Sequence, residues 1–389
     1  MHVQLPPALP GGSLHSQLLP HKRMTQAEPS ASTQMLPVRP PRARRRSSAD
    51  LILGVLARFG AIGILVLLSA LVVVLTMSAL PSIREFGVDF LVTSEWRANE
   101  LEVPVRDEAG EIVYEDGEML TDTVPARFGA LPVIYGTTVS SIIALLFAVP
   151  LSLGAALFII RIAPRLRIAA PLSFLVEFLA AIPSIAYGMW GLFVFGPFLR
   201  DYLQPGIKGL LGSVPGFHWM FFQQLQVGGT TIERPIPLTG RDMMTGGLVL
   251  GIMILPIVTA VSRDVLRAVP KIQIEGALAL GATWWQSSWG MLRYAKAGLF
   301  GAVMLGLARA AGETMAVTMV IGNNNQIEPS PFAPSQTMSS LLANEFAEAS
   351  GDLHRAALLE VALILLLMSL LLNIAARYLV VGRRRGPAA

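Results

Sequence analysis

Residues 298–322 read GLFGAVMLGLARAAGETMAVTMVIG, and this stretch decides the fold. It is apolar and long enough to cross a bilayer, which takes about 20 residues of helix. Arg309 and Glu313 stand in its middle, four residues apart and therefore on one face of a helix. A charge at the centre of a span costs roughly 2.5–3.5 kcal/mol on insertion scales. Such a pair indicates a transport path or a functional contact.

The two faces of this predicted helix differ in composition. At about 100° per residue, one arc collects the small and charged residues, which are Ala302, Gly306, Arg309, Ala310 and Glu313. The opposite arc is smooth and suits lipid, with Phe300, Met304, Leu307, Ala311 and Met315. Small residues one turn apart let another helix approach closely. The pattern therefore predicts that the charged pair faces protein or a wet cavity.

The composition is that of a membrane protein. Apolar residues make up 53% of the chain and charged residues 14%, which is far from the balance of soluble proteins. There is no cysteine, so disulfides and thiolate metal sites are excluded. The positive net charge does not indicate nucleic-acid binding, because the basic residues cluster at the ends of spans. We therefore expect an all-α polytopic membrane protein, and we expect no metal site.

The first fifty residues differ from the rest of the chain. They are rich in Pro, Ser and Gln, lack periodicity and end in a run of arginines, which predicts a disordered basic cytoplasmic tail over 1–50. A secretory signal is the alternative. The apolar run at 51–80 is much longer than the ~7–15 residues of a signal core, which favours an uncleaved first span. A second short basic tail is expected at 382–389.

Six spans are predicted, and they lie at roughly 51–80, 131–160, 171–199, 243–262, 298–322 and 355–381. An acidic extracytoplasmic insertion over 81–130 separates the first span from a core of five spans over 131–381. Pro and Gly interrupt the third and fourth spans, and Pro183 is expected to kink the third. Such breaks are tolerated where neighbouring helices satisfy the backbone.

The basic residues predict the orientation of the spans. One side holds both tails and the segments that begin at Arg161 and Arg263. The other side holds 81–130, 200–242 and 323–354, of which the first is acidic and the last has no Lys or Arg. The positive-inside rule then places both termini in the cytoplasm.

The outer loops carry little recognisable chemistry. Residues 105–120 resemble a short hairpin with turns at Ala109–Gly110 and Asp116–Gly117. Their carboxylates lack the spacing of an EF-hand, so a solvated surface is favoured over a cation site. His218 stands among apolar residues, which is more typical of a structural residue than of a ligand.

The longest inner loop, at 263–297, is too polar to span the membrane. After Pro270 its pattern predicts a short amphipathic helix, a turn at Gly281 and a second short helix, and the second part is rich in tryptophan. Two interpretations are open. The loop is either a helical hairpin anchored at the membrane interface by its tryptophans or a docking element for a cytoplasmic partner.

The first half of this loop resembles the EAA loop of ABC importer permeases. The match is EGALALG at Glu275–Gly281, although Arg293 and Tyr294 stand where that family usually has Leu-Pro. In that family the loop is a coupling helix that sits in a groove of the ATP-binding subunit. The resemblance therefore implies an ATPase-coupling role for Glu275, Gly276, Ala277 and Gly281.

Four more segments narrow the resemblance to the phosphate-specific ABC importer permeases, and they are 135–154, 177–197, 248–266 and 304–323. The R-x-x-x-E-T-M-A motif of the last segment is similar to the C-type subunit more than to its A-type partner. The resemblance implies a type I permease fold with six transmembrane helices in a bacterial inner membrane. It also implies three partners: an A-type permease, an ATP-binding subunit dimer and an extracytoplasmic phosphate-binding protein.

A phosphate path needs positive charge and hydrogen-bond donors, because an uncompensated anion cannot cross hydrocarbon. Arg309 offers a planar fork that stays charged, and Glu313 would hold it in place between transport events. A pure helix lock is the alternative role for this pair. Glu177 either faces the same cavity or reaches water at the cytoplasmic end of its span. The candidate hydroxyl donors, which alternatively satisfy helix backbone, are Thr137, Thr138, Ser184 and Tyr187.

The sequence contains no G-x-x-x-x-G-K-[ST] loop, so we expect a transport subunit without enzymatic activity or cofactor, with ATP used by a partner subunit. One alternative is a permease for another oxyanion, such as phosphonate or molybdate. Another is an ion-coupled secondary transporter that works alone, which inverted repeats would favour. A membrane enzyme or sensor is disfavoured, because no nucleophile–base pair is evident.

Overall fold

The computed structural model describes residues 48–98, 101–104, 114–115, 118–119, 121–227, 230–349 and 351–382. Residues 1–47 of the predicted N-terminal tail and residues 383–389 of the C-terminal one lie outside the described residues. The chain divides into two compact units, residues 1–63 and residues 64–389. The first unit contains the beginning of helix α1 (Ser48–Phe86), and the described residues from Ile64 onward belong to the second unit.

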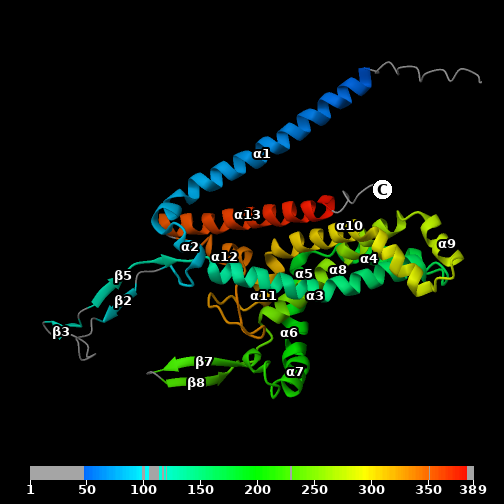
Figure 1. Ribbon diagram of the computed structural model, residues 1–389. Coiled ribbons are helices and arrows are strands. Elements are labelled where there is room, and N and C mark those ends of the chain that lie inside the picture. The colour runs from blue at the N-terminus through cyan, green and yellow to red at the C-terminus, as the bar shows by residue number, and fades with distance from the viewer. Residues whose placement is uncertain are drawn as a thin grey trace, which may run out of the picture. The chain divides into compact units, whose positions relative to one another are not determined.

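Among the described residues, five helices are long and apolar enough to cross a membrane by length and composition. They are α1, α3 (Leu131–Arg161), α8 (Met243–Arg267), α10 (Trp284–Ala311) and α13 (Asp352–Gly382) (Figure 1). A further candidate span is broken: α4 (Ala169–Ala180) and the helical segment Ser184–Leu211 meet at an angle of 87°. Counting this pair as one gives the six predicted spans, and the break confirms the kink expected at Pro183.

The second half of the broken span is not a regular α-helix. It begins as α5 (Ser184–Trp190), continues through α6 (Gly196–Phe198) and ends as α7 (Gln204–Leu211). Two π-helical turns separate these pieces, η1 (Gly191–Phe195) and η2 (Leu199–Leu203). Glycines let this segment lie close to its neighbours. A Cβ atom on Gly188 would stand 2.9 Å from the Cα of Ala316.

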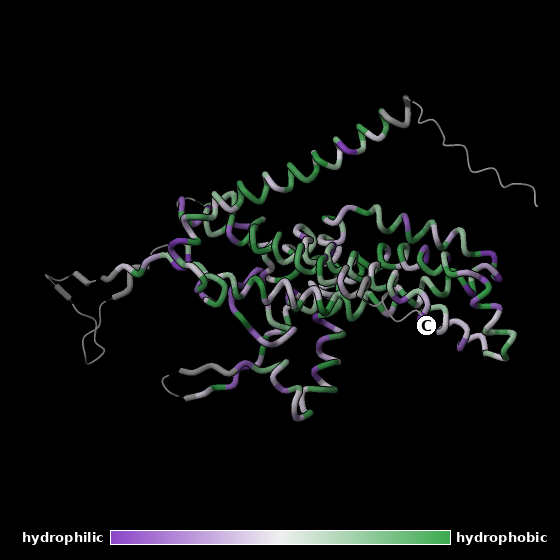
Figure 2. Tube along the Cα trace, turned by 45° about the horizontal axis from the view of Figure 1, so that its top comes forward, coloured by the Kyte–Doolittle hydropathy of each residue, from purple (hydrophilic) through white to green (hydrophobic). Residues whose placement is uncertain are grey.

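The core forms where α3 and α10 pack against α8. Close approach of α3 and α8 depends on glycine, because a Cβ on Gly247 would stand 2.6 Å from Ile143 Cβ and one on Gly251 2.9 Å from Phe147 Cδ1. Buried alanines of α3 fill this seam with Val249 and Ile254. Figure 2 shows hydrophobic residues along these helices and hydrophilic ones at loops and helix ends.

Short elements lie in two of the segments that are predicted to be extracytoplasmic. The segment after α1 begins with α2 (Asp89–Val92). Its described residues also form three antiparallel strand pairs, which are β1 (Trp96–Arg97) with β6 (Arg127–Phe128), β2 (Leu101–Pro104) with β5 (Thr121–Val124), and β3 (Tyr114–Glu115) with β4 (Glu118–Met119). The β3–β4 pair flanks the predicted turn at Asp116–Gly117, whereas the turn at Ala109–Gly110 lies outside the described residues. The second segment holds η3 (His218–Met220) and a hairpin of β7 (Phe222–Val227) and β8 (Thr230–Pro235). His218 stacks on Phe222 with ring centroids 4.1 Å apart, which suits the structural role predicted for it.

The inner loop and the fifth predicted span differ from the prediction. The first short helix is present as α9 (Lys271–Ala279), and Gly281 has a positive φ of 84° at the predicted turn. The predicted second short helix is not separate, because it is the beginning of α10. A capping box between Thr283 and Gln286 starts α10.

The same helix then runs without a break into the membrane-length stretch and stops at Ala311. The single helix predicted over 298–322 is therefore wrong, because the chain leaves helical geometry at residues 312–314 and resumes as α11 (Met315–Val320). The remaining helix is α12 (Met338–Glu345), whose first turn is buried.

Candidate functional site

The charged pair lies where α10 ends. Arg309 is two residues before the last residue of α10, and Glu313 stands in the break that follows. Arg309 Nη2 is 3.6 Å from Glu313 Oε2, and the second carboxylate oxygen, Oε1, accepts a hydrogen bond of 3.4 Å from the Ala316 N–H. A cation at a helix C-terminus and an anion before the next helix are both favourable positions for charge.

The two partners differ in exposure, which the sequence did not predict. The Glu313 side chain is 5% exposed, whereas the Arg309 side chain is 48% exposed. The small residues of the predicted arc are buried as expected, and a Cβ on Gly306 would stand 2.6 Å from Val258 Cγ2 of α8. Arg309 instead belongs to an exposed stripe of the same helix with Gly301 and Leu305.

The arc predicted to face lipid is only partly exposed. Phe300, Met304 and Leu307 are half-buried, and Met315 is exposed. The prediction is wrong for Ala311, which is 2% exposed. The reason is that α10 ends at this residue, so the arcs of one continuous helix no longer apply beyond it.

The break in span five is held by a residue that the sequence did not single out. Ser339 Oγ, at the start of α12, donates a hydrogen bond of 2.7 Å to the backbone oxygen of Glu313. The same turn of α12 is fixed to α3, because the Met338 N–H donates to Thr137 Oγ1 at 2.9 Å. The start of α12 therefore connects α3 to Glu313. A contact between residues 26 positions apart leaves no local signal in the sequence.

The four candidate hydroxyl donors are placed differently. Thr137 is 1% exposed and also donates to the backbone oxygen of Val133 at 2.7 Å, so its hydroxyl is fully engaged in structure. Thr138 donates to Ile134 O within its own helix at 2.8 Å. Ser184 begins α5 and is half-buried. A direct contact of these residues with a transported ion stays a prediction.

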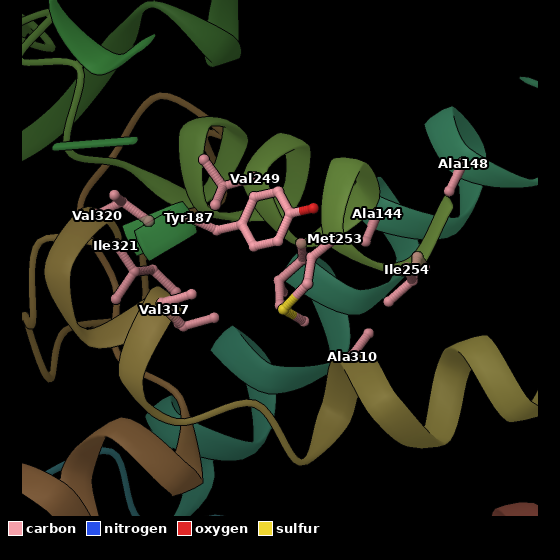
Figure 3. Packing of buried hydrophobic residues seen from close by; sticks show 12 residues of the cluster. Ala144, Ala148, Tyr187, Val249, Met253, Ile254, Ala310, Val317, Val320 and Ile321 are labelled. Atoms are coloured by element: carbon pink, nitrogen blue, oxygen red, sulfur yellow. The ribbon is translucent and has the colours of Figure 1, made fainter. Parts of the chain in front are cut away.

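Tyr187 bridges the break in the third span. Its hydroxyl donates a hydrogen bond of 2.9 Å to the backbone oxygen of Leu179, which lies on the other side of Pro183. Figure 3 shows its ring in the buried cluster that also contains Ala310 of α10 and Val317 of α11. Tyr187 thus belongs to the same buried cluster as residues on both sides of the break that carries Glu313.

Glu177 is paired with an arginine other than Arg309. Its Oε1 accepts a hydrogen bond of 3.0 Å from Arg263 Nη1, and Arg263 lies four residues before the end of α8. The Glu177 side chain is half-exposed, whereas Arg263 is buried. Of the two alternatives for Glu177, this position agrees with the one that places it near the predicted cytoplasmic side.

The candidate coupling residues form one exposed element. Glu275, Gly276 and Ala277 lie on α9, and Gly281 makes the turn after it. Some apolar side chains of this element point away from the rest of the protein, with Ile272 73% and Leu280 91% exposed, whereas Ile274 packs against a buried cluster. Exposed apolar side chains at a helix of this kind indicate a contact surface for another protein or a membrane.

A buried carboxyl lies just before α8. Asp242 caps this helix by accepting a hydrogen bond of 2.8 Å from the Thr245 N–H, and Gln204 Nε2 donates to its other oxygen at 2.7 Å. Burial raises the pKa of Asp242 to about 6, although both hydrogen bonds act in the opposite direction. Gln204 Oε1 is buried and has no hydrogen-bond partner among the described residues.

Comparison with known proteins identifies relatives over most of the chain. Residues 148–385 match the family described as binding-protein-dependent transport system inner membrane component. The phosphate transport system permease protein PstC of Mesorhizobium japonicum is 38% identical over 337 residues, which cover 86% of this chain and 91% of that protein. The protein of the same name from Pasteurella multocida is 40% identical over 313 residues, covering 80% and 85%. PstC 1 of Mycobacterium tuberculosis is 37% identical over 329 residues, covering 82% and 90%.

Among solved structures, an inward-facing conformation of the MetNI methionine ABC transporter is similar with a TM-score of 0.45 and 16% identity, over 65% of this chain and 94% of that one. This likeness is too distant to carry an argument. The apolar helices and the relatives together show an integral membrane protein that crosses the membrane several times. The chain therefore belongs to the family of the binding-protein-dependent transport system inner membrane components.

Proposed function

We propose that this chain is a permease subunit of an ATP-driven importer of inorganic phosphate and forms half of its translocation path. The observation that carries the proposal is Arg309, which is half-exposed beside a buried glutamate in the predicted fifth span. The substrate is supported by the relatives, whose names describe permease proteins of phosphate transport systems. We further propose that the spans lie in a bacterial inner membrane with both termini in the cytoplasm, as the distribution of basic residues predicts.

The exposure of Arg309 favours a path over a lock. A guanidinium that only locked helices would be buried with its partner, whereas half of this side chain has no protein cover within the described chain. A charge that faces lipid within a span costs several kcal/mol, so we infer that the exposed stripe faces water or another protein. A water-filled path between this chain and a second permease would supply both water and a protein neighbour. The guanidinium fork can then hold two phosphate oxygens.

Glu313 would regulate how strongly Arg309 holds the anion. Its carboxylate is fixed by the Ala316 N–H, and its backbone is fixed by Ser339, so it stays beside Arg309 whether or not phosphate is present. A carboxylate next to the arginine neutralises part of the positive charge. Binding then stays weak enough for release, which a transport site needs.

The energy for transport would come from a separate ATP-binding subunit. The sequence has no phosphate-binding loop of its own, and α9 presents exposed apolar side chains on the predicted cytoplasmic side. Because α9 is followed directly by α10, Arg309 lies on the helix that starts at the docking element. The 26 residues from Trp284 to Arg309 span about 38 Å of continuous helix.

We propose the remaining partners on the same grounds. One chain offers one coupling element in its described part, so a dimer of ATP-binding subunits would need a second permease chain as its other docking site. An extracytoplasmic phosphate-binding protein would deliver the ion to the outer segments. The family description, a binding-protein-dependent transport system component, supports that partner class.

Replacing Arg309 tests the proposal. Arg309→Gln should abolish ATP-dependent phosphate uptake into proteoliposomes while the permease and the ATP-binding subunit still copurify. Arg293→Gln is the matched control, because it makes the same change on the same helix at a residue whose guanidinium lies over Trp289. Normal uptake by Arg309→Gln would refute the assignment. Recovery of uptake by exchanging the two charges, Arg309→Glu with Glu313→Arg, would show a lock instead.

A further inference from the structure

The ion pair between Glu177 and Arg263 joins two elements that the chain separates by 86 residues. The Arg263 side chain is 8% exposed and contacts two carboxylates, Glu177 and Asp264, each at 3.0 Å. Asp264 is the next residue on the same helix, so its contact connects nothing further. Glu177 lies on α4, which packs along α8. The Glu177 contact therefore fixes α4 to the end of α8.

Arg263 lies close to the coupling element. The helix α8 ends at Arg267 and α9 begins at Lys271, so only three residues separate them. This connection is stiff, because Ala268 N and Val269 N donate to carbonyls of the last turn of α8 at 3.2 Å each. Val269 is also buried in a cluster with Met291 of α10. A displacement of α9 therefore reaches the last turn of α8, where Arg263 stands.

Glu177 lies close to the break in the third span. It is three residues before the end of α4, and the next turn of the chain is bridged by the hydrogen bond from Tyr187 to Leu179. Tyr187 belongs to the buried cluster that also holds Ala310 and Val317 (Figure 3), and its helix α5 packs against α11, which begins two residues after Glu313. A groove of about 240 Å³ lined by Ile182, Tyr187 and Ile252 lies beside the break in the third span. The contacts thus run from α9 to the charged pair.

We propose that Glu177 is a positioning residue for coupling: its ion pair with Arg263 transmits movement of α9 to the broken span and, through Tyr187, to Arg309 and Glu313. The inference rests on the proposed function and adds a second connection between docking element and path, beside the continuous helix α10. Its role is to make ATP hydrolysis depend on ion movement. It does not contribute to binding the ion.

The consequence is a change in stoichiometry and not a simple loss of uptake. Without the ion pair, α9 can move while α4 and α5 stay in place, so ATP is hydrolysed without transport. When two sites in a protein are coupled, a ligand at one site typically changes the affinity of the other by about five-fold or more. Glu177→Gln should therefore raise the ATP hydrolysed per phosphate transported by about five-fold or more. A residue that only stabilises the fold lowers both rates together and leaves this ratio unchanged.

The experiment measures that ratio in proteoliposomes that contain the complete transporter. The variants are Glu177→Gln, Arg263→Gln and the double variant, with Asp264→Asn as the matched control because it removes a contact of equal length from the same arginine. Because Glu177 is half-exposed, its variant should assemble even where Arg263→Gln does not. The double variant should be no worse than the more severe single one, since residues that act as a pair are not additive.

The two proposals fail in different ways. Absence of ATP-dependent phosphate uptake by the wild-type transporter would overturn the proposed function itself. Normal uptake by the wild type together with an unchanged ratio in Glu177→Gln would overturn only the coupling role. An equal rise of the ratio in Asp264→Asn would also overturn it, because that contact does not join two elements. A rise confined to Glu177→Gln and Arg263→Gln supports it.

Discussion

Asp242 makes the stability of this protein depend on pH in a direction that can be worked out from its surroundings. The carboxyl is fully buried at the start of α8, and burial raises its pKa from 3.8 to about 6. Because the folded protein holds the proton more tightly than the unfolded chain does, the protonated form is the stabilised one. The contribution of protonated Asp242 to the stability of the folded protein is complete below a pH of about 4 and is lost as the pH rises through about 6.

The size of this effect follows from the difference between the two pKa values. Each pKa unit corresponds to about 1.36 kcal/mol, so the interval from 3.8 to about 6 amounts to about 3 kcal/mol. Roughly half of that loss falls between pH 5 and pH 7. Asp242→Asn removes the titration and keeps the helix cap, because asparagine is as good a cap as aspartate. The introduced amide nitrogen would face Gln204 Nε2, so the Gln204 amide must turn over, and its Oε1, which has no partner among the described residues, then accepts the hydrogen bond.

The assay is thermal unfolding of the detergent-solubilised protein at pH 5 and pH 7. Asp242→Asn should be more stable than wild type at pH 7, and this advantage should shrink by about 1.4 kcal/mol at pH 5. Glu348→Gln removes an exposed carboxyl and should keep the pH dependence of wild type. An Asp242→Asn advantage that is equal at both pH values would refute the reasoning.

Two further predictions concern packing and hydrogen bonding. Gly306→Val should destabilise the protein by about 1–3 kcal/mol relative to Gly301→Val, because a side chain at Gly306 meets Val258 whereas Gly301 has open space. Equal unfolding temperatures of the two variants would contradict this. Thr137→Val should cost about 1–3 kcal/mol more than Thr138→Val, because it leaves the buried Met338 N–H without an acceptor. Equal losses in chemical unfolding would show that this contact does not hold α12.

Much of the fold could be predicted because its signals are local. Apolar runs of membrane length gave the spans, Pro183 marked the bend of 87°, and Gly281 marked a turn that needs a positive φ. The small residues Ala302, Gly306 and Ala310 predicted the buried side of α10 correctly. Periodicity and backbone chemistry determine each of these features within a few residues of sequence.

The features that could not be predicted depend on contacts between distant residues. The break at residues 312–314 contains no proline, and it is stabilised by Ser339, which donates to the Glu313 backbone from α12. The exposure of Arg309 follows from which helices cover α10, and no single-helix pattern contains that information. The pairing of Glu177 with Arg263 joins α4 to α8, and a one-dimensional pattern offers no means to choose Arg263 over Arg309.

The role of the candidate site stays a prediction. The cost of charge in a span singled out Arg309 and Glu313 in the sequence. Of the residues considered as donors to an anion, Thr137 and Tyr187 donate hydrogen bonds to protein backbone in the structure. Hydroxyl groups in apolar helices satisfy backbone carbonyls as readily as they bind ligands.

The central claim is that this chain provides the path for phosphate in an ATP-driven importer. Its most direct test is uptake of labelled phosphate into vesicles that contain the chain with a second permease, the ATP-binding subunits and the binding protein. We expect uptake that requires ATP and is not competed by sulfate, molybdate or phosphonate. Uptake that persists without ATP, or that molybdate or phosphonate suppresses at the concentration at which phosphate itself does, would contradict it.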